Sequence, residues 1–188
     1  MTLSSSEKAA RARQRMVDKA REYSLGTYCA RFVAPLYQKM VRAEYAAQPS
    51  GITLAVVCGE LGYVFRDIGQ CVCVTCGKVA PWSGGLRGMH TGHFLASRRN
   101  SILFEPDNAA PQCSRCNRYE SGAPERFRLW MLREKGPHVI EWLEQLKRQT
   151  RHFTREELVD MRIEFGARLK AAEKRIRQGL LDTGLGFC

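Results

Sequence analysis

Two cysteine pairs enclose the part of this 188-residue chain that is best equipped for chemistry. The pairs are Cys73-x-x-Cys76 and Cys113-x-x-Cys116, and residues 77–112 lie between them. Each Cys-x-x-Cys turn directs two sulfurs toward one point, so two such pairs supply the four thiolates of a tetrahedral structural zinc. The spacing therefore predicts one zinc held by these four cysteines. The alternative is that they are free thiols with a coincidental spacing.

The other four cysteines do not form a pair of this kind. Cys71 lies two residues before Cys73 and is a competing candidate ligand. The remaining three have no partner spacing and are expected to be buried or free thiols: Cys29, Cys58 and Cys188.

Four further polar residues lie inside or directly beside this cysteine frame: His90, His93, Asn108 and Asn117. A zinc with four thiolate ligands does not need them, which makes them candidates for a second, catalytic site. A histidine of ordinary pKa, about 6.5, is largely neutral at pH 7 and can accept a proton from water.

The order of these residues resembles the His-Asn-His (HNH) nuclease motif in its zinc-braced, treble-clef form, with Asn at the third motif position. The matching segments are Cys-x-x-Cys-Gly at 73–77, Gly-His-Phe at 92–94, Pro-Asp-Asn at 106–108 and Cys-x-x-Cys-Asn at 113–117. The sequence resembles the phage NinG/Rap recombination nuclease family more closely. This resemblance continues through Asn-Arg-Tyr-Glu-Ser-Gly at 117–122 and covers roughly residues 61–176. Phage endonuclease VII resolvases are similar to this site more distantly, and the first 60 residues show no match.

This resemblance implies a mainly α, α+β fold: a treble-clef ββα-metal (HNH) module with zinc, flanked by N- and C-terminal helices. It also implies a metal-dependent, structure-selective DNA endonuclease of phage or prophage recombination that cleaves branched intermediates such as D-loops and Holliday junctions. Its cofactors would be a structural Zn²⁺ and a catalytic divalent metal, Mg²⁺ or Mn²⁺. In such a site a histidine activates water, while the metal relieves charge at the scissile phosphate.

The resemblance also assigns roles to single residues. His93 matches the general base, and Asn117 matches the catalytic-metal ligand at the start of a helix. Asn108 matches the central Asn, whose amide would brace the loop and orient the backbone of the histidine.

One position departs from the common pattern. Gly92 stands where many HNH sites have an Asp or His ligand. NinG-type proteins place an acidic residue about three positions before the base, so His90 is a candidate replacement, with Glu105 and Asp107 as weaker candidates. The alternative is that His90 is a plain surface histidine. An imidazole and an amide make a weak Mg²⁺ site, so Mn²⁺ or a transition ion is expected to support activity better.

The charge of the chain indicates a polyanionic partner. Thirty Lys and Arg against nineteen Asp and Glu give a net charge of +11, spread along the whole sequence. DNA is the simplest such partner. Five arginines near the motif are candidate phosphate contacts, or alternatively solvated charge: Arg87, Arg98, Arg99, Arg115 and Arg118. Trp82 and Tyr119 are candidates for stacking on bases, although core packing is the commoner role of aromatic residues.

The sequence also favours an intracellular protein, and the resemblance implies the cytoplasm of a bacterial host cell. The N-terminus is polar and charged, without the apolar core of a signal peptide. The cysteine spacing is typical of metal binding under reducing conditions. The most apolar run, residues 52–65, is short and contains Glu60, so no membrane span is expected.

Four regions are expected along the chain: a helical N-terminal region (1–68), the zinc-braced HNH module (69–122), C-terminal helices (123–178) and a flexible tail (179–188). In the first region we expect a helix from the Ser4/Glu7 capping box to about Glu22, a second over 28–47 disturbed by Pro35, and a third over 53–67. The third rests on the helical spacing of Leu54, Val57, Leu61, Val64, Phe65 and Ile68.

In the module, β-prone pieces lie at 89–95 and 102–104. Beyond it we expect a helix that starts at Pro124 and stops at Gly136, a short helix around 140–146, and a final helix capped by Thr154 and Glu157. The C-terminal helices would pack on the module or form a homodimer, because symmetric junction cleavage needs two sites.

Three other functions remain compatible with the sequence. The first is an HNH nuclease acting on ordinary duplex DNA, as in restriction or packaging. The second is a non-catalytic zinc module that binds nucleic acid or protein. The third is a degenerate site that binds junctions without cutting them.

Overall fold

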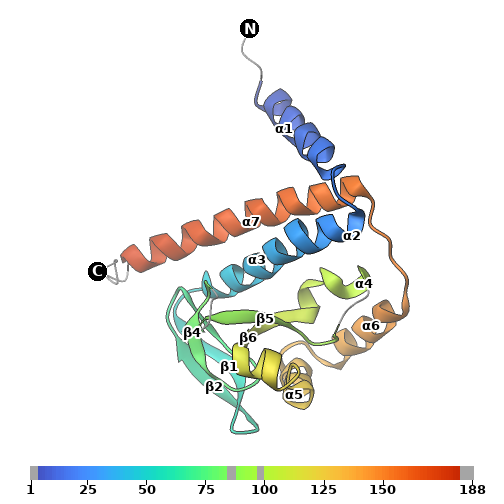
Figure 1. Ribbon diagram of the computed structural model, residues 1–188. Helices are drawn as coiled ribbons and strands as arrows, with labels where there is room; N and C mark the ends of the chain where they lie inside the picture. Colours follow the sequence, from blue (N-terminus) through green and yellow to red (C-terminus); the bar gives the residue numbers. More distant parts are fainter. Residues whose placement is uncertain (1–3, 84–87, 97–99, 183–188) are drawn as a thin grey trace.

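Helices from both ends of the chain cover one side of a β-rich part that carries the cysteines (Figure 1). The computed structural model describes residues 4–83, 88–96 and 100–182. Helix α3 (Ala34–Ala46) lies between helix α7 (Arg155–Asp182) and the hairpin of strands β5 (Met89–His93) and β6 (Ala109–Cys113). The fold is thus mixed α+β and mainly helical, as predicted.

The N-terminal helices follow the sequence closely. In α1 (Ser5–Ala20) Glu7 N donates to Ser4 Oγ, and Ser4 N donates to the Glu7 carboxylate, which confirms the capping box. The second helical stretch comprises α2 (Leu25–Tyr28), the π-helical segment η1 (Cys29–Val33) and α3. Pro35, near the start of α3, has no N–H to donate, and the turn before it widens so that Ala34 N donates to Cys29 O.

The predicted helix over 53–67 is wrong, so the region 1–68 is not wholly helical. These residues form an antiparallel hairpin of β1 (Gly51–Val57) and β2 (Glu60–Arg66), in which Val57 pairs with Glu60. The two turn residues, Cys58 and Gly59, have φ of 52° and 92°. Positive φ at both central positions is the geometry of tight hairpin turns that suit the twist of the strands.

The cysteine region contains two further short hairpins. Strand β3 (Gln70–Val72) pairs with β4 (Val79–Pro81), and β5 pairs with β6 in antiparallel register. The β-prone piece at 89–95 therefore contains a strand. The piece predicted at 102–104 does not: helix α4 (Asn100–Leu103) occupies it, followed by the 3₁₀ turn η2 (Pro106–Asn108). The π-helical segment η3 (Arg115–Tyr119) follows β6.

The C-terminal helices are α5 (Pro124–Glu134), α6 (Pro137–Arg148) and α7. The Thr154/Glu157 cap of α7 is confirmed, because Glu157 N donates to Thr154 Oγ1 and Thr154 N donates to the Glu157 carboxylate. Helix α7 continues to Asp182, so the flexible tail predicted from Gly179 is wrong for residues 179–182. Residues 183–188 lie outside the described part of the chain.

Two cores hold the molecule together. The larger joins α1, α3 and α7 to the cysteines, and the smaller joins α5 and α6 to Val56, Val74 and Ala110. The apolar face of α7 thus packs within the chain, mainly against α3. Among the described residues, no helix is both long and apolar enough to cross a bilayer.

Candidate metal centre and adjoining histidine site

The four predicted zinc ligands converge. The sulfurs of Cys73, Cys76, Cys113 and Cys116 all lie within 4.8 Å of one another, and those of Cys76 and Cys113 are 3.7 Å apart. Sulfurs bonded at ~2.3 Å to one tetrahedral zinc are about 3.8 Å apart. Three of the four cysteines are buried and Cys76 is half-buried. The four cysteines are therefore arranged to hold a metal ion such as zinc.

A tight backbone turn forms the first half of this cluster. Cys73 N donates to Lys78 O at 2.8 Å, and Gly77 N donates to Cys73 O at 2.9 Å. Gly77 has φ of +73°, and a Cβ there would lie 2.8 Å from Val57 Cγ2. Only glycine suits both the positive φ and the contact with the β1–β2 hairpin. The hairpin that replaced the predicted helix thus supports the cysteine turn.

Hydrogen bonding to Cys76 lowers the pKa of the Cys73 thiol, against the opposing effect of burial. A lowered thiol pKa favours the thiolate form in which a cysteine binds a metal. Cys71 does not join the cluster. Burial raises its pKa to about 12, and its thiol donates to Arg42 O at 3.3 Å. The predicted competition from Cys71 is therefore absent.

His93, the predicted base, is half-buried at the end of β5. Its Nε2 lies 3.3 Å from Leu103 O. A carbonyl oxygen only accepts, so Nε2 must carry the proton and Nδ1 must present its lone pair. Burial lowers the pKa of His93, against a smaller opposite effect of the Leu103 contact. The imidazole is thus neutral at pH 7, with one nitrogen able to accept a proton.

Asn108 is fully buried and bonds across the segment that follows β5. Its Oδ1 accepts from Leu95 N at 2.8 Å, and its Nδ2 donates to Leu95 O at 3.1 Å and to Ile102 O at 3.3 Å. Its backbone oxygen accepts from Phe94 N at 2.8 Å. These contacts hold the segment after β5 against the turn that precedes β6.

One face of the β5–β6 hairpin carries His90 and Gly92. In the register His90 is opposite Gln112, and Gly92 is opposite Ala110. His90 Nε2 is buried and has no hydrogen-bond partner among the described residues. Burial lowers the pKa of His90, as do the positive charges of Arg118 and Arg42, so this imidazole is neutral at pH 7.

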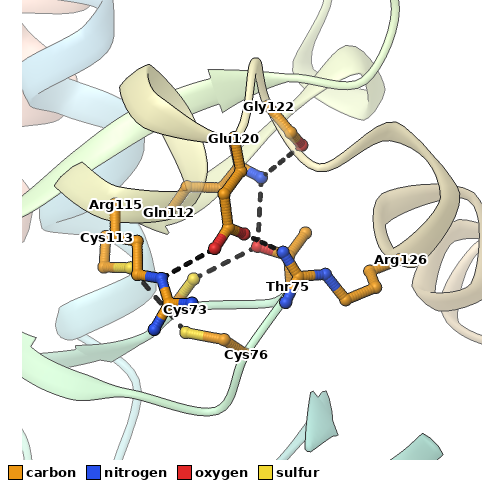
Figure 2. Close-up of polar contacts among 9 residues, drawn as sticks. All are labelled: Cys73, Thr75, Cys76, Gln112, Cys113, Arg115, Glu120, Gly122 and Arg126. Atoms are coloured by element: carbon orange, nitrogen blue, oxygen red, sulfur yellow. Dashed lines mark hydrogen bonds and ion pairs between the residues drawn. The ribbon is translucent and has the colours of Figure 1, made fainter. Parts of the chain in front are cut away.

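Gln112 is a site residue that the sequence analysis missed. It is fully buried, and its Nε2 donates to Gly122 O at 2.8 Å and to Thr75 Oγ1 at 3.1 Å (Figure 2). Thr75 Oγ1 in turn lies 3.3 Å from Cys73 Sγ. The available signal was a single amide between Pro111 and the ligand Cys113 in an otherwise apolar strand.

The other proposed metal ligands have different surroundings. Asn117 is half-buried in η3, the segment that contains Cys116 and contacts β5. Asp107 forms an ion pair with Lys135 at 2.9 Å, so its carboxylate is already engaged. Burial raises the pKa of Glu105.

The candidate phosphate contacts are only partly described. Arg87, Arg98 and Arg99 lie outside the described residues. Arg118 is exposed, whereas Arg115 is exposed but held by Glu120 at 2.7 Å (Figure 2). Arg126 binds the same carboxylate.

Of the two aromatic residues singled out, Tyr119 is 83% exposed. Trp82 is half-buried, with the Lys39 ammonium over its ring. Tyr119 is thus the one that is open to a partner.

Comparisons with known proteins bear on the region that carries this site. No curated protein and no solved structure matches the chain. A family model described as Bacteriophage Lambda NinG protein matches residues 63–175, which is more than half of the chain and includes the cysteine cluster, His93, Asn108 and Asn117. The chain therefore belongs to the NinG family of bacteriophage proteins.

Proposed function

We propose that the protein is a zinc-stabilised, metal-dependent HNH-type endodeoxyribonuclease. The observation that carries this proposal is the state of His93, a neutral imidazole whose Nε2–H is directed to Leu103 O and whose Nδ1 is left to accept a proton. It lies at the end of β5, in the hairpin whose other strand ends at Cys113. The fixed tautomer is what a general base for water requires.

The residues of this chain then divide the work of phosphodiester hydrolysis. His93 Nδ1 takes a proton from the attacking water, and Asn108 keeps the following loop, and with it the ring, in place. His90 and Asn117 would hold the catalytic ion, since His90 offers an unpaired nitrogen and Asn117 an amide oxygen. A divalent ion bound there supplies charge relief at the phosphate and at the leaving 3′-oxygen. The mixed nitrogen and oxygen donors suit Mn²⁺ better than Mg²⁺.

The proposed substrate is branched DNA, such as D-loops and Holliday junctions. Membership of a bacteriophage family and the net charge of +11 support DNA as the partner. Phosphate and shape contacts direct cutting when no element enters a groove to read bases. We propose a homodimer for paired cuts at a junction. The apolar face of α7 is used within the chain, so this dimer would form through another surface.

The test is a cleavage assay on linear duplex, D-loop and four-way junction DNA of equal length, with Mn²⁺, Mg²⁺ or EDTA. We expect metal-dependent cutting of the branched substrates, and a loss of at least about 100-fold in His93→Ala with its zinc content unchanged. His138→Ala, on the exposed side of α6, is the matched control.

Each alternative has its own result in this assay. If linear duplex is cut as well as the branched substrates, the proposed preference for branched DNA is rejected in favour of a nuclease that acts on ordinary duplex. Cutting that is no higher in wild type than in zinc-loaded His93→Ala would end the enzyme proposal. Light scattering of the complex with a four-way junction reports whether two protomers bind.

A further inference from the structure

Two unpaired polar atoms lie on the same face of the β5–β6 hairpin. They are His90 Nε2 and Gln112 Oε1, both buried and both without a hydrogen-bond partner among the described residues. Their residues are directly opposite in the antiparallel register. Side chains at such positions start ≈ 4.5–5.5 Å apart and share a face of the sheet. Two unsatisfied atoms of this kind are costly unless something binds them.

The direction of the Gln112 oxygen is fixed by the partners of its nitrogen. Gly122 O can only accept, so the amide must turn Nε2 toward it, and Thr75 Oγ1 receives the second N–H. Oε1 is then left on the side of Gly92. A flipped amide would set two oxygens against each other at Gly122, so this orientation is not interchangeable.

That oxygen lies where a side chain at position 92 would begin. A Cβ on Gly92 would be only 2.0 Å from Gln112 Oε1 and 2.6 Å from Gln112 Cδ. Position 92 also directly precedes His93, the proposed base. The glycine therefore leaves room for an oxygen donor that arrives from the opposite strand.

We propose that the side-chain oxygen of Gln112 is a ligand of the catalytic divalent ion, taking the place of the side chain that Gly92 lacks, with His90 Nε2 as the adjacent ligand. This inference rests on the proposed nuclease site and completes its ligand set. Thr75 links this amide to Cys73, so the cysteine cluster orients a ligand of the second metal as well as bracing the fold.

The test measures Mn²⁺ binding to the zinc-loaded full chain without DNA, by electron paramagnetic resonance titration. Gln112→Ala should weaken Mn²⁺ binding at least tenfold. Gly92→Asp/Gln112→Ala should recover wild-type affinity or better, because the shortened residue 112 frees the space for a carboxylate at 92. Gln178→Ala, an exposed glutamine on α7, is the control. Zinc content and melting temperature are measured for each variant.

Recovery in the double variant separates a ligand from a structural amide. Unchanged Mn²⁺ affinity in Gln112→Ala would overturn the proposal, as would a loss that the double variant does not recover. If Gln112→Ala loses its zinc, Gly92→Ala takes its place, because it keeps residue 112 but displaces its oxygen. It should lower Mn²⁺ affinity with zinc retained, and unchanged affinity would again overturn the proposal.

The failure of this inference is distinguishable from failure of the nuclease proposal. If cleavage depends on metal but Mn²⁺ affinity does not depend on Gln112, only the assignment of Gln112 as a ligand is rejected. If Mn²⁺ binding depends on Gln112 but no DNA is cleaved, the proposed metal site is supported and the proposed nuclease activity is rejected.

Discussion

His93 donates from one ring nitrogen to a backbone carbonyl and keeps its lone pair on the other, and burial widens the pH range in which this neutral state exists. The imidazole must be neutral to accept a proton from water. Burial disfavours the charged form and so lowers the pKa of His93 from 6.5. The neutral fraction at any given pH is therefore larger than for an exposed histidine.

The pH dependence of cleavage follows from this direction. As pH falls, activity should decline with protonation of His93, and the midpoint of the acid limb of kcat/KM should lie below 6.5. A bound divalent ion nearby would shift it further in the same direction. The profile is measured in Mn²⁺ on a four-way junction, with zinc content followed at each pH because acid also protonates the thiolates. A midpoint above 6.5 would contradict the assignment of His93 as the base.

Asn108 is the residue whose loss should cost most stability near the site. Replacing it with alanine leaves Leu95 N and two carbonyl oxygens without their partner in a fully buried setting. We expect Asn108→Ala to lower the free energy of unfolding by about 2–4 kcal/mol, measured by urea denaturation. Half-buried Asn117→Ala is the comparison and should cost less. Equal losses would show that Asn108 does not brace this loop.

Candidate site residues that belong to a spaced motif could be singled out from the sequence. Residues whose role depends on the pairing of two strands could not. The four cysteines, Asn108 and His93 stand at spacings that carry information by themselves. Gln112 has no such spacing, and its importance comes from the cross-strand pairing with His90 and from the absence of a side chain at Gly92. Both facts require the alignment of two strands that are distant in sequence.

At the scale of single elements, the β1–β2 hairpin is the segment whose apolar pattern led to a wrong prediction. Its apolar residues fit a helical period, but Ile52, Leu54 and Val56 also alternate as a strand does. The choice of a hairpin over a helix depends on Cys58 and Gly59, which form a two-residue turn with positive φ. Cys-Gly is not among the dipeptides that usually form such turns, so the local sequence did not indicate a hairpin here. The capped helices were predictable because their signals are local.

This turn gives a pair of substitutions with opposite expected signs. Gly59 has φ of +92°, and a Cβ added there would meet nothing within 4 Å, so Gly59→Ala tests backbone conformation alone. It should destabilise the protein by about 1–2 kcal/mol, because an L-residue resists this region. Cys58→Gly removes the same resistance at φ of 52° and should leave stability unchanged or raise it. Urea denaturation measures both. A loss in Cys58→Gly that matches Gly59→Ala would contradict the turn.

For the whole molecule, the cysteine cluster and the helical layer share one core. Cys73, Cys113 and Cys116 belong to the same buried cluster as Tyr37 of α3 and Phe165 of α7. The hairpin is attached to it as well, through Val56 N, which donates to Val74 O at 2.9 Å. Within the part of the chain that the structure describes, the cysteines and the helices that cover them therefore pack as one unit.

Removal of the cluster's metal should therefore destabilise the whole chain. In small zinc modules the free energy of metal binding is a large part of the free energy of folding. We expect a strong zinc chelator to lower the melting temperature of the helical circular dichroism signal and of the near-ultraviolet signal together. Cys113→Ser should reproduce this shift without chelator, whereas Cys58→Ser, at an exposed turn outside the cluster, should not. Because α3 packs on both α7 and the β5–β6 hairpin, the loss at the cysteines has a direct route into the helical layer. Helices that melt unchanged after the chelator has removed the zinc would show that the two parts fold separately.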